Sequence, residues 1–118
     1  MKVMIVDDNA STSDLLQYML SKISFESCKA RDGCEAILRY LEEQPDLVLM
    51  DLRMPVMDGI TTTRRLLHEY PSAKIVIVTG YDSGFYRDAA KDAGALEYIV
   101  KDHLTQLPEV LASYVTIH

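Results

Sequence analysis

Acidic residues stand directly after two short apolar segments of this sequence. Asp7 and Asp8 follow residues 3–6 (VMIV), and Asp51 follows residues 47–50 (LVLM). The carboxyl ends of neighbouring strands in an open parallel sheet face one crevice, so these three carboxylates are expected to meet there. Like charges at that distance repel, which either raises the pKa of one carboxyl group or favours a hard divalent cation with oxygen ligands. We expect a magnesium site.

Polar residues also follow two further apolar segments. Thr79 comes after residues 75–78 (IVIV), and Lys101 comes after residues 98–100 (YIV). An aspartate after a strand is also a common turn former or helix N-cap, so the acidic residues by themselves are ambiguous. Five polar residues at the ends of four expected strands favour a chemical site over a set of turns.

Strand-like and helix-like patterns alternate five times with short connections, which is typical of βα units around a parallel sheet. Strands are expected at residues 3–6, 25–30, 47–50, 75–78 and 98–100, with residues 25–30 at an edge because polar residues are mixed into that segment. Apolar spacing and capping residues predict helices over about 13–23, 32–45, 59–70, 86–94 and 107–116. The fourth helix has a small, alanine-based apolar face, so we expect it to be held weakly and to suit an element that shifts.

Length and composition bound the class of protein. The 118 residues are expected to form one domain, residues 1–118, because no linker is visible. No apolar run approaches the ~18 residues of a membrane span, and the first strand begins without room for a signal peptide, so we expect a soluble, cytoplasmic domain with no membrane partner. Twelve basic and eighteen acidic residues give a net charge of −6, which argues against nucleic-acid binding by this domain.

The cysteines and histidines give no sign of a site. Cys28 and Cys34 have a spacing that matches neither a zinc knuckle nor a redox pair, so both are expected to be buried and reduced. His68, His103 and His118 carry no phosphorelay pattern and are expected at the surface, with His103 nearest the site.

The polar residues together have the spacing of a known family pattern. The pattern consists of Asp7-Asp8, Asp51 followed by Met54-Pro55-x-x-Asp58-Gly59, Thr79, and Tyr98 three residues before Lys101. With these motifs the whole chain resembles the CheY-like receiver domain of two-component response regulators. The resemblance implies a flavodoxin-like (βα)5 three-layer sandwich, with a five-stranded parallel sheet in the order 2-1-3-4-5 and two helices on one face against three on the other.

The resemblance also implies a role for each site residue. Asp51 would be the phosphoacceptor, a carboxylate nucleophile that takes a phosphoryl group from a histidine kinase or phosphotransfer protein. Mg2+ would be bound by Asp51, by Asp8 directly, by Asp7 mainly through water, and by the backbone carbonyl of Arg53. Lys101 would pair with a phosphoryl oxygen. The domain would catalyse its own phosphorylation and hydrolysis but would turn over no external substrate.

Two residues are implied as the switch that reads out phosphorylation. Thr79 would donate its hydroxyl to the phosphoryl group, and Tyr98 would then rotate from an exposed to a buried position. The response would change binding of an output domain, a downstream protein or a second copy through the face formed by helix four, strand five and helix five. The alternative for Tyr98 is fixed packing against helix four.

This chain departs from the family pattern after the site lysine. The family often has proline there, with a cis bond, whereas Asp102 follows Lys101 here; a non-proline cis bond costs ~3–4 kcal/mol, so the geometry of this loop is open. The Lys-Asp pair with a leucine in the next helix start also resembles receivers that are joined to helix-turn-helix DNA-binding domains. For the Arg53 side chain, influence on water at the site and simple exposure in a loop both remain open.

Three other classes of protein share part of the pattern. A haloacid dehalogenase-type phosphatase also uses an aspartate nucleophile, but it needs a second acid where Arg53 stands and a cap domain. A flavodoxin-like cofactor carrier would need a glycine-rich phosphate loop after the first strand, where Asp7-Asp8 stands instead. A phosphorylation-independent scaffold is compatible with the fold but would not require all five polar site residues.

Overall fold

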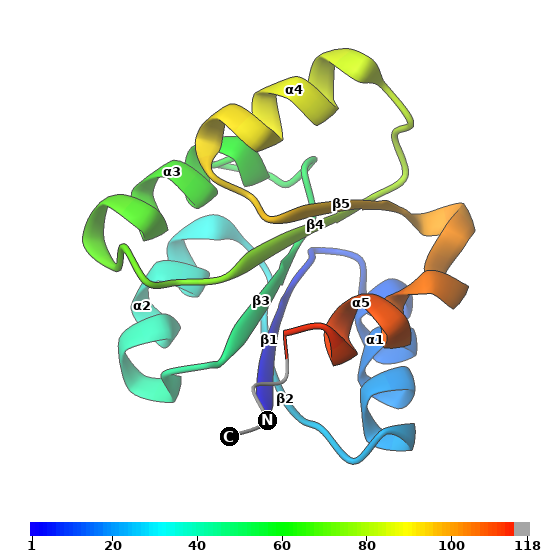
Figure 1. Ribbon diagram of the computed structural model, residues 1–118. Helices are drawn as coiled ribbons and strands as arrows, with labels where there is room; N and C mark the ends of the chain where they lie inside the picture. Colours follow the sequence, from blue (N-terminus) through cyan, green and yellow to red (C-terminus); the bar gives the residue numbers. More distant parts are fainter. Residues whose placement is uncertain (115–118) are drawn as a thin grey trace.

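The computed structural model describes residues 1–114, which form a parallel sheet with helices on both faces (Figure 1). The sheet has five strands in the order β2-β1-β3-β4-β5, which confirms the expected fold class and strand order. The strands are β1 (Lys2–Val6), β2 (Glu26–Ala30), β3 (Leu47–Met50), β4 (Ile75–Thr79) and β5 (Glu97–Val100). Every neighbouring pair is parallel, so the carboxyl ends of all five strands lie at the same edge of the sheet.

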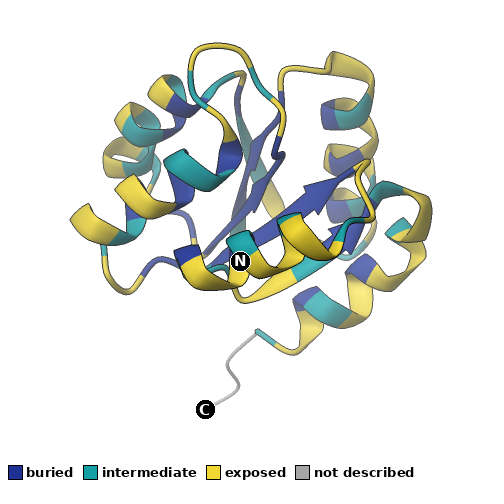
Figure 2. Ribbon diagram, turned by 90° about the horizontal axis from the view of Figure 1, so that it is seen from above, coloured by how far each residue is buried: buried dark blue, intermediate teal, exposed yellow. Residues whose placement is uncertain are grey.

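Alternate strand residues build two separate cores, one on each face of the sheet. Val3 and Ile5 point to a core that they share with leucines of α1 (Ala10–Lys22) and α5 (Leu107–Ala112). Met4 and Val6 point to the other core, which is covered by α2 (Gly33–Glu43), α3 (Gly59–Glu69) and α4 (Gly84–Ala93). Figure 2 shows the buried residues concentrated in the sheet and on the helix sides that face it. The expected arrangement of two helices against three is therefore present.

Polar side chains at the N-terminal ends fix where the helices begin. Asn9 accepts a hydrogen bond from the Thr12 N–H (3.1 Å), so α1 begins at Ala10 and the expected start at residue 13 was wrong. That expectation followed the apolar spacing, which misses a polar first turn. Asp32 and Asp58 cap α2 and α3 in the same way through bonds of 2.8 Å, as their sequence positions predicted.

The segment after β5 differs from the single helix that was expected over 107–116. A 3-10 helix over Lys101–Gln106 leads into α5, whose residues Leu107 and Leu111 are buried in the core. The α-helix ends at Ala112: the Ser113 N–H is shared between the Glu109 and Val110 carbonyls, and the Tyr114 N–H bonds three residues back to the Leu111 carbonyl at 3.1 Å. Residues 115–118, which include the expected end of this helix and His118, lie outside the described part of the chain.

The solvent exposure of the cysteine and histidine side chains can be compared with the sequence predictions. Cys34 is exposed on the first turn of α2 and Cys28 is half-buried, so the expectation that both are buried was wrong, although both are free thiols. The position of Cys34 on the outer side of α2 explains the error, because residue type alone does not determine which side of a helix faces solvent. His68 and His103 are exposed, as expected. No helix within residues 1–114 is long and apolar enough to cross a membrane.

The apolar face of α4 is as small as its sequence indicates. Only Ala90 and Ala93 are buried, whereas Phe85 is 76% exposed. Gly94 ends the helix with a positive φ of 106°, a conformation that favours glycine. Little apolar area therefore holds α4 against the sheet.

Candidate functional site

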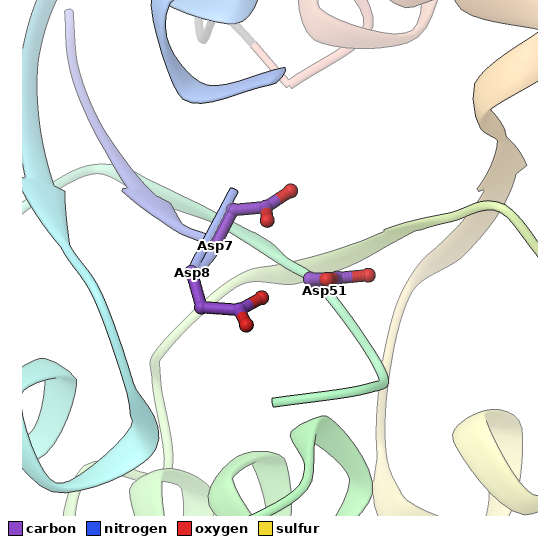
Figure 3. A group of neighbouring side chains, drawn as sticks. All are labelled: Asp7, Asp8 and Asp51. Carbon is purple, nitrogen blue, oxygen red and sulfur yellow. The ribbon is translucent and has the colours of Figure 1, made fainter. Parts of the chain in front are cut away.

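Three carboxylates meet at the carboxyl edge of the sheet, between β1 and β3 (Figure 3). Asp7 and Asp8 leave the end of β1 and Asp51 leaves the end of β3, because Val6 and Met50 are opposite each other in the register of these strands. One carboxylate oxygen from each of the three residues lies within 4.8 Å of the others. The structure thus brings together the three acidic residues that the sequence placed at strand ends.

Backbone groups hold the two buried carboxylates in place. Asp7 Oδ1 accepts a hydrogen bond from the Asn9 N–H, and Asp51 Oδ1 accepts one from the Leu52 N–H, both at 2.9 Å. Gly59 passes so close that a Cβ there would lie 2.0 Å from the backbone carbonyl oxygen of Asp51. The start of α3 can therefore pack against the phosphoacceptor candidate only because residue 59 has no side chain.

Lys101 supplies a positive charge to the cluster. Its Nζ lies 3.0 Å from Asp7 Oδ2 and 3.6 Å from Asp51 Oδ1. The described backbone contains no cis peptide bond, so the bond between Lys101 and Asp102 is trans. The lysine reaches the carboxylates without the proline that the family often has.

Burial and a neighbouring carboxylate both raise the pKa of Asp51. Burial raises the pKa of Asp51 from its ordinary 3.8 to about 6, and the Asp7 carboxylate adds to the rise, while Lys101 and the Leu52 N–H oppose it. Asp51 is 7% exposed and Asp7 3% exposed, whereas Asp8 is open to solvent. A hard cation bound from the Asp8 side would relieve the repulsion, and this set of oxygen donors suits Mg2+.

Thr79 lies at the end of β4 and is completely buried. Its Oγ1 accepts a hydrogen bond of 3.3 Å from the Tyr81 N–H, so its oxygen contacts the loop that leads to α4. The structure therefore places Thr79 at the same edge of the sheet as the carboxylates, in a position that links this edge to the β4–α4 loop.

Tyr98 is half-buried and is held from two sides. Its hydroxyl donates a 2.5 Å hydrogen bond to the Tyr81 carbonyl, and the guanidinium carbon of Arg87 on α4 lies 4.7 Å from its ring centroid. The ring of Tyr98 therefore packs against Arg87 of α4. The rotation of Tyr98 stays a prediction.

Arg53 is exposed in the β3–α3 loop, and its guanidinium carbon lies 5.1 Å from the ring centroid of Tyr81. This cation–π contact links the loop after β3 to the loop after β4. The assignment of the Arg53 carbonyl as a metal ligand stays a prediction.

Two contact residues at this end of the molecule were missed by the sequence reasoning. Tyr81 joins Arg53, Thr79 and Tyr98, and Arg87 covers the ring of Tyr98. Both form contacts between segments that are distant in the sequence. The one local signal is the position of Tyr81, two residues after Thr79.

A family model places the chain in a known class. The model of the response regulator receiver domain matches residues 3–112. The chain belongs to this family, as its sheet order and its carboxylate cluster indicate.

Individual relatives agree with this assignment. The alkaline phosphatase synthesis transcriptional regulatory protein PhoP of Bacillus subtilis (strain 168) is 33% identical over 100 residues, which cover 85% of this chain and 42% of that protein. This chain therefore spans about two fifths of the length of that relative. The BeF3-activated N-terminal receiver domain of Klebsiella pneumoniae RstA is 27% identical with a TM-score of 0.90, covering 98% of this chain and 100% of that one. The response regulator TrrA of Thermotoga maritima, in complex with Mg2+ and BeF, is 29% identical with a TM-score of 0.88, covering 97% of this chain and 98% of that one.

Proposed function

We propose that this receiver domain is a phosphorylation-activated switch in which Asp51 accepts a phosphoryl group from a histidine kinase or phosphotransfer protein. The observation that carries the proposal is a buried carboxylate with two carboxylate neighbours within 4.8 Å and the Lys101 ammonium at 3.6 Å. Such a set combines a nucleophile, a cation site and a fixed positive charge, which are the parts that phosphoryl transfer requires. The similarity to TrrA, whose structure is in complex with Mg2+ and BeF, also supports the proposal.

The proposed step begins from the ionised form of Asp51. A carboxylate oxygen attacks the phosphorus of a phosphohistidine, the new P–O bond forms while the P–N bond breaks, and the histidine nitrogen leaves with the electron pair. Lys101 opposes protonation of Asp51 and lies close enough to stabilise negative charge on the incoming phosphoryl group. Attack of water on the phosphorus would later release inorganic phosphate and restore the carboxylate.

The metal would be held by Asp7, Asp8, Asp51 and the backbone carbonyl of Arg53. Mg2+, when bound, neutralises charge on the phosphoryl oxygens and on the carboxylates. The protein provides the ligands on a rigid sheet edge and keeps Asp51 away from bulk water. It turns over no external substrate in this scheme, because the group that reacts is part of the protein.

The readout would pass through the contacts of Tyr81. A phosphoryl oxygen that accepts a hydrogen bond from the Thr79 hydroxyl would pull on the loop that carries Tyr81. The Tyr81 carbonyl in turn accepts the hydrogen bond of the Tyr98 hydroxyl. Because α4 buries little apolar area, a small force on this loop can shift the helix. A coupling of ~1–3 kcal/mol would change affinity at the α4/β5/α5 face for an output domain, a downstream protein or a second copy by about one or two orders of magnitude.

Intact mass spectrometry tests the proposed function. The native chain is incubated with a small phosphodonor such as acetyl phosphate, with and without Mg2+, beside Asp51→Asn. One added phosphoryl group is expected only for the native chain with Mg2+. An adduct on Asp51→Asn, or none on a folded native chain that binds Mg2+ and is offered an active kinase, would instead favour a phosphorylation-independent scaffold.

A further inference from the structure

Two adjoining hollows follow the seam between α2 and α3, which lie side by side at the left of Figure 1. One hollow of about 420 Å³ is lined by Ile37 of α2 and by Arg64, Arg65, His68 and Glu69 of α3. The other, of about 380 Å³, lies at the C-terminal ends of both helices and also includes Glu69. Glu69 lines both hollows, and we refer to the two together as the α2–α3 groove. None of its lining residues belongs to the carboxylate site.

The α2 side of the groove is apolar and open to solvent. Ile37, which lines the first hollow, is half-buried, and Leu41, which lines the second, is 63% exposed. Leu38 follows Ile37 in α2 and is 71% exposed, but it lines neither hollow. Spacings of three and four residues place Leu41 next to both Leu38 and Ile37 on the surface of α2. Single exposed leucines are common on protein surfaces, but an apolar stripe that borders a groove is typical of a binding surface.

The α3 side of the groove is positively charged. Arg64 and Arg65 are exposed, and within residues 1–114 neither guanidinium forms an ion pair or a cation–π contact. On the other side of α2, by contrast, Arg39 lies 3.3 Å from the carboxylate of Glu43. Two arginines against the single carboxylate of Glu69 leave the groove basic in a chain whose net charge is −6. The free guanidinium groups are suited to bind carboxylates of a partner.

We propose that the α2–α3 groove is a docking surface for an acidic amphipathic helix of a partner protein. The apolar side of such a helix would pack on Leu38, Leu41 and Ile37, and its carboxylates would meet Arg64 and Arg65. Two arginines beside exposed leucines, on a chain with excess acid, favour a protein segment over nucleic acid, whose binding depends on many phosphate contacts. The groove contains neither the carboxylate site nor the α4/β5/α5 face, so a partner can occupy it in either phosphorylation state.

A synthetic peptide is the probe for this surface. It is a helical peptide with leucines three and four residues apart and glutamates along the adjoining side, and its matched control has glutamine at each glutamate. Titration into the 15N-labelled chain is followed by NMR. Saturable shifts confined to the amides of α2 and α3, with at least tenfold weaker binding of the glutamine peptide, are expected.

Protein variants test both halves of the groove. Arg64→Glu with Arg65→Glu, and Leu38→Ser with Leu41→Ser, should each weaken peptide binding at least tenfold. Lys22→Glu with Lys91→Glu makes the same change in net charge outside the groove and should alter binding less than twofold. Arg64, Arg65, Leu38 and Leu41 are all exposed, so folded variants are expected, as amide dispersion in the spectra checks.

Several results would overturn the proposal. These are an absence of saturable binding at millimolar peptide, shifts centred outside α2 and α3, or an equal loss of binding in the matched charge variant. Binding of a single-stranded oligonucleotide at the same amides without peptide binding would assign the groove to nucleic acid, and a dimer that Arg64→Glu with Arg65→Glu dissociates would assign it to a second copy. Asp51→Asn should bind the peptide unchanged, so failure of this proposal and of the phosphorylation switch are distinguishable.

Discussion

Replacement of Asp51 by asparagine should stabilise the metal-free protein at neutral pH. The pKa of Asp51 is raised from 3.8 to about 6, chiefly by burial and then by the Asp7 carboxylate. Since one pKa unit corresponds to about 1.4 kcal/mol, keeping Asp51 ionised at pH 7 costs the folded state up to about 3 kcal/mol. Solvent at the open side of the site screens part of this repulsion, and asparagine loses the attraction to Lys101. We expect a net gain of about 1–2 kcal/mol in the free energy of unfolding.

The pH dependence of this gain follows from the direction of the shift. A group with a raised pKa binds its proton more tightly in the folded state, so the native protein loses stability as pH rises from about 4 to about 6. Asp51→Asn, which has no carboxyl group at this position, should not lose this stability as the pH rises. The difference between the two proteins should be near zero at pH 4 and complete at pH 7.

Urea unfolding in the presence of a chelator, at several pH values between 4 and 7, measures the difference. Asp88→Asn, an exposed aspartate on α4, is the matched control and should change the free energy of unfolding by less than about 0.5 kcal/mol. Mg2+ should stabilise the native chain more than Asp51→Asn, because binding to the folded site adds to stability. A variant that is less stable than the native chain at pH 7, or a gain that is larger at pH 4, would refute the electrostatic reasoning.

Three further substitutions probe the site and its surroundings. Lys101→Met removes the one ammonium within 4 Å of the two buried carboxylates among the described residues, so it should raise the pKa of Asp51 further. Phosphorylation by acetyl phosphate, measured by intact mass over time, should be at least tenfold slower. An unchanged rate would contradict the role assigned to Lys101. Tyr98→Phe keeps the ring but deletes the hydrogen bond to the Tyr81 carbonyl, so urea unfolding should show a free energy of unfolding lower by about 0.5–1.5 kcal/mol. An unchanged free energy of unfolding would argue against this hydrogen bond. Gly59→Ala places a Cβ against backbone and should cost more than about 2 kcal/mol, whereas Gly84→Ala, where a Cβ meets open space, should be neutral or stabilising; equal effects would refute the clash.

The fold and the cluster of acidic residues could be predicted because both follow from local pattern. Four short apolar segments, each followed by a polar residue, identify the strands and their carboxyl ends, and parallel pairing brings those ends together. Asp7, Asp8 and Asp51 therefore needed no tertiary information. The start of α1 was missed because the first turn after the Asn9 cap is polar, so the apolar spacing does not include it.

Other features depend on tertiary packing and could not be predicted from pattern. The Tyr98 hydroxyl bonds to the Tyr81 carbonyl and the Tyr98 ring contacts the Arg87 guanidinium, and each contact joins separate segments of the chain. The exposure of Cys34 and of the leucines on α2 depends on how that helix is rotated against the sheet and against α3. Apolar spacing in a sequence identifies an apolar side, but it does not show whether a neighbouring helix covers it.

The central claim is that Asp51 itself carries the phosphoryl group. Borohydride reduces an acyl phosphate to an alcohol, so the chain is phosphorylated in the presence of Mg2+, reduced and analysed by tandem mass spectrometry of its peptides. The prediction is homoserine at position 51, dependent on both Mg2+ and phosphodonor. Homoserine at position 7 or 8, or a phosphoryl group that survives reduction on a serine, threonine or histidine, would contradict the account.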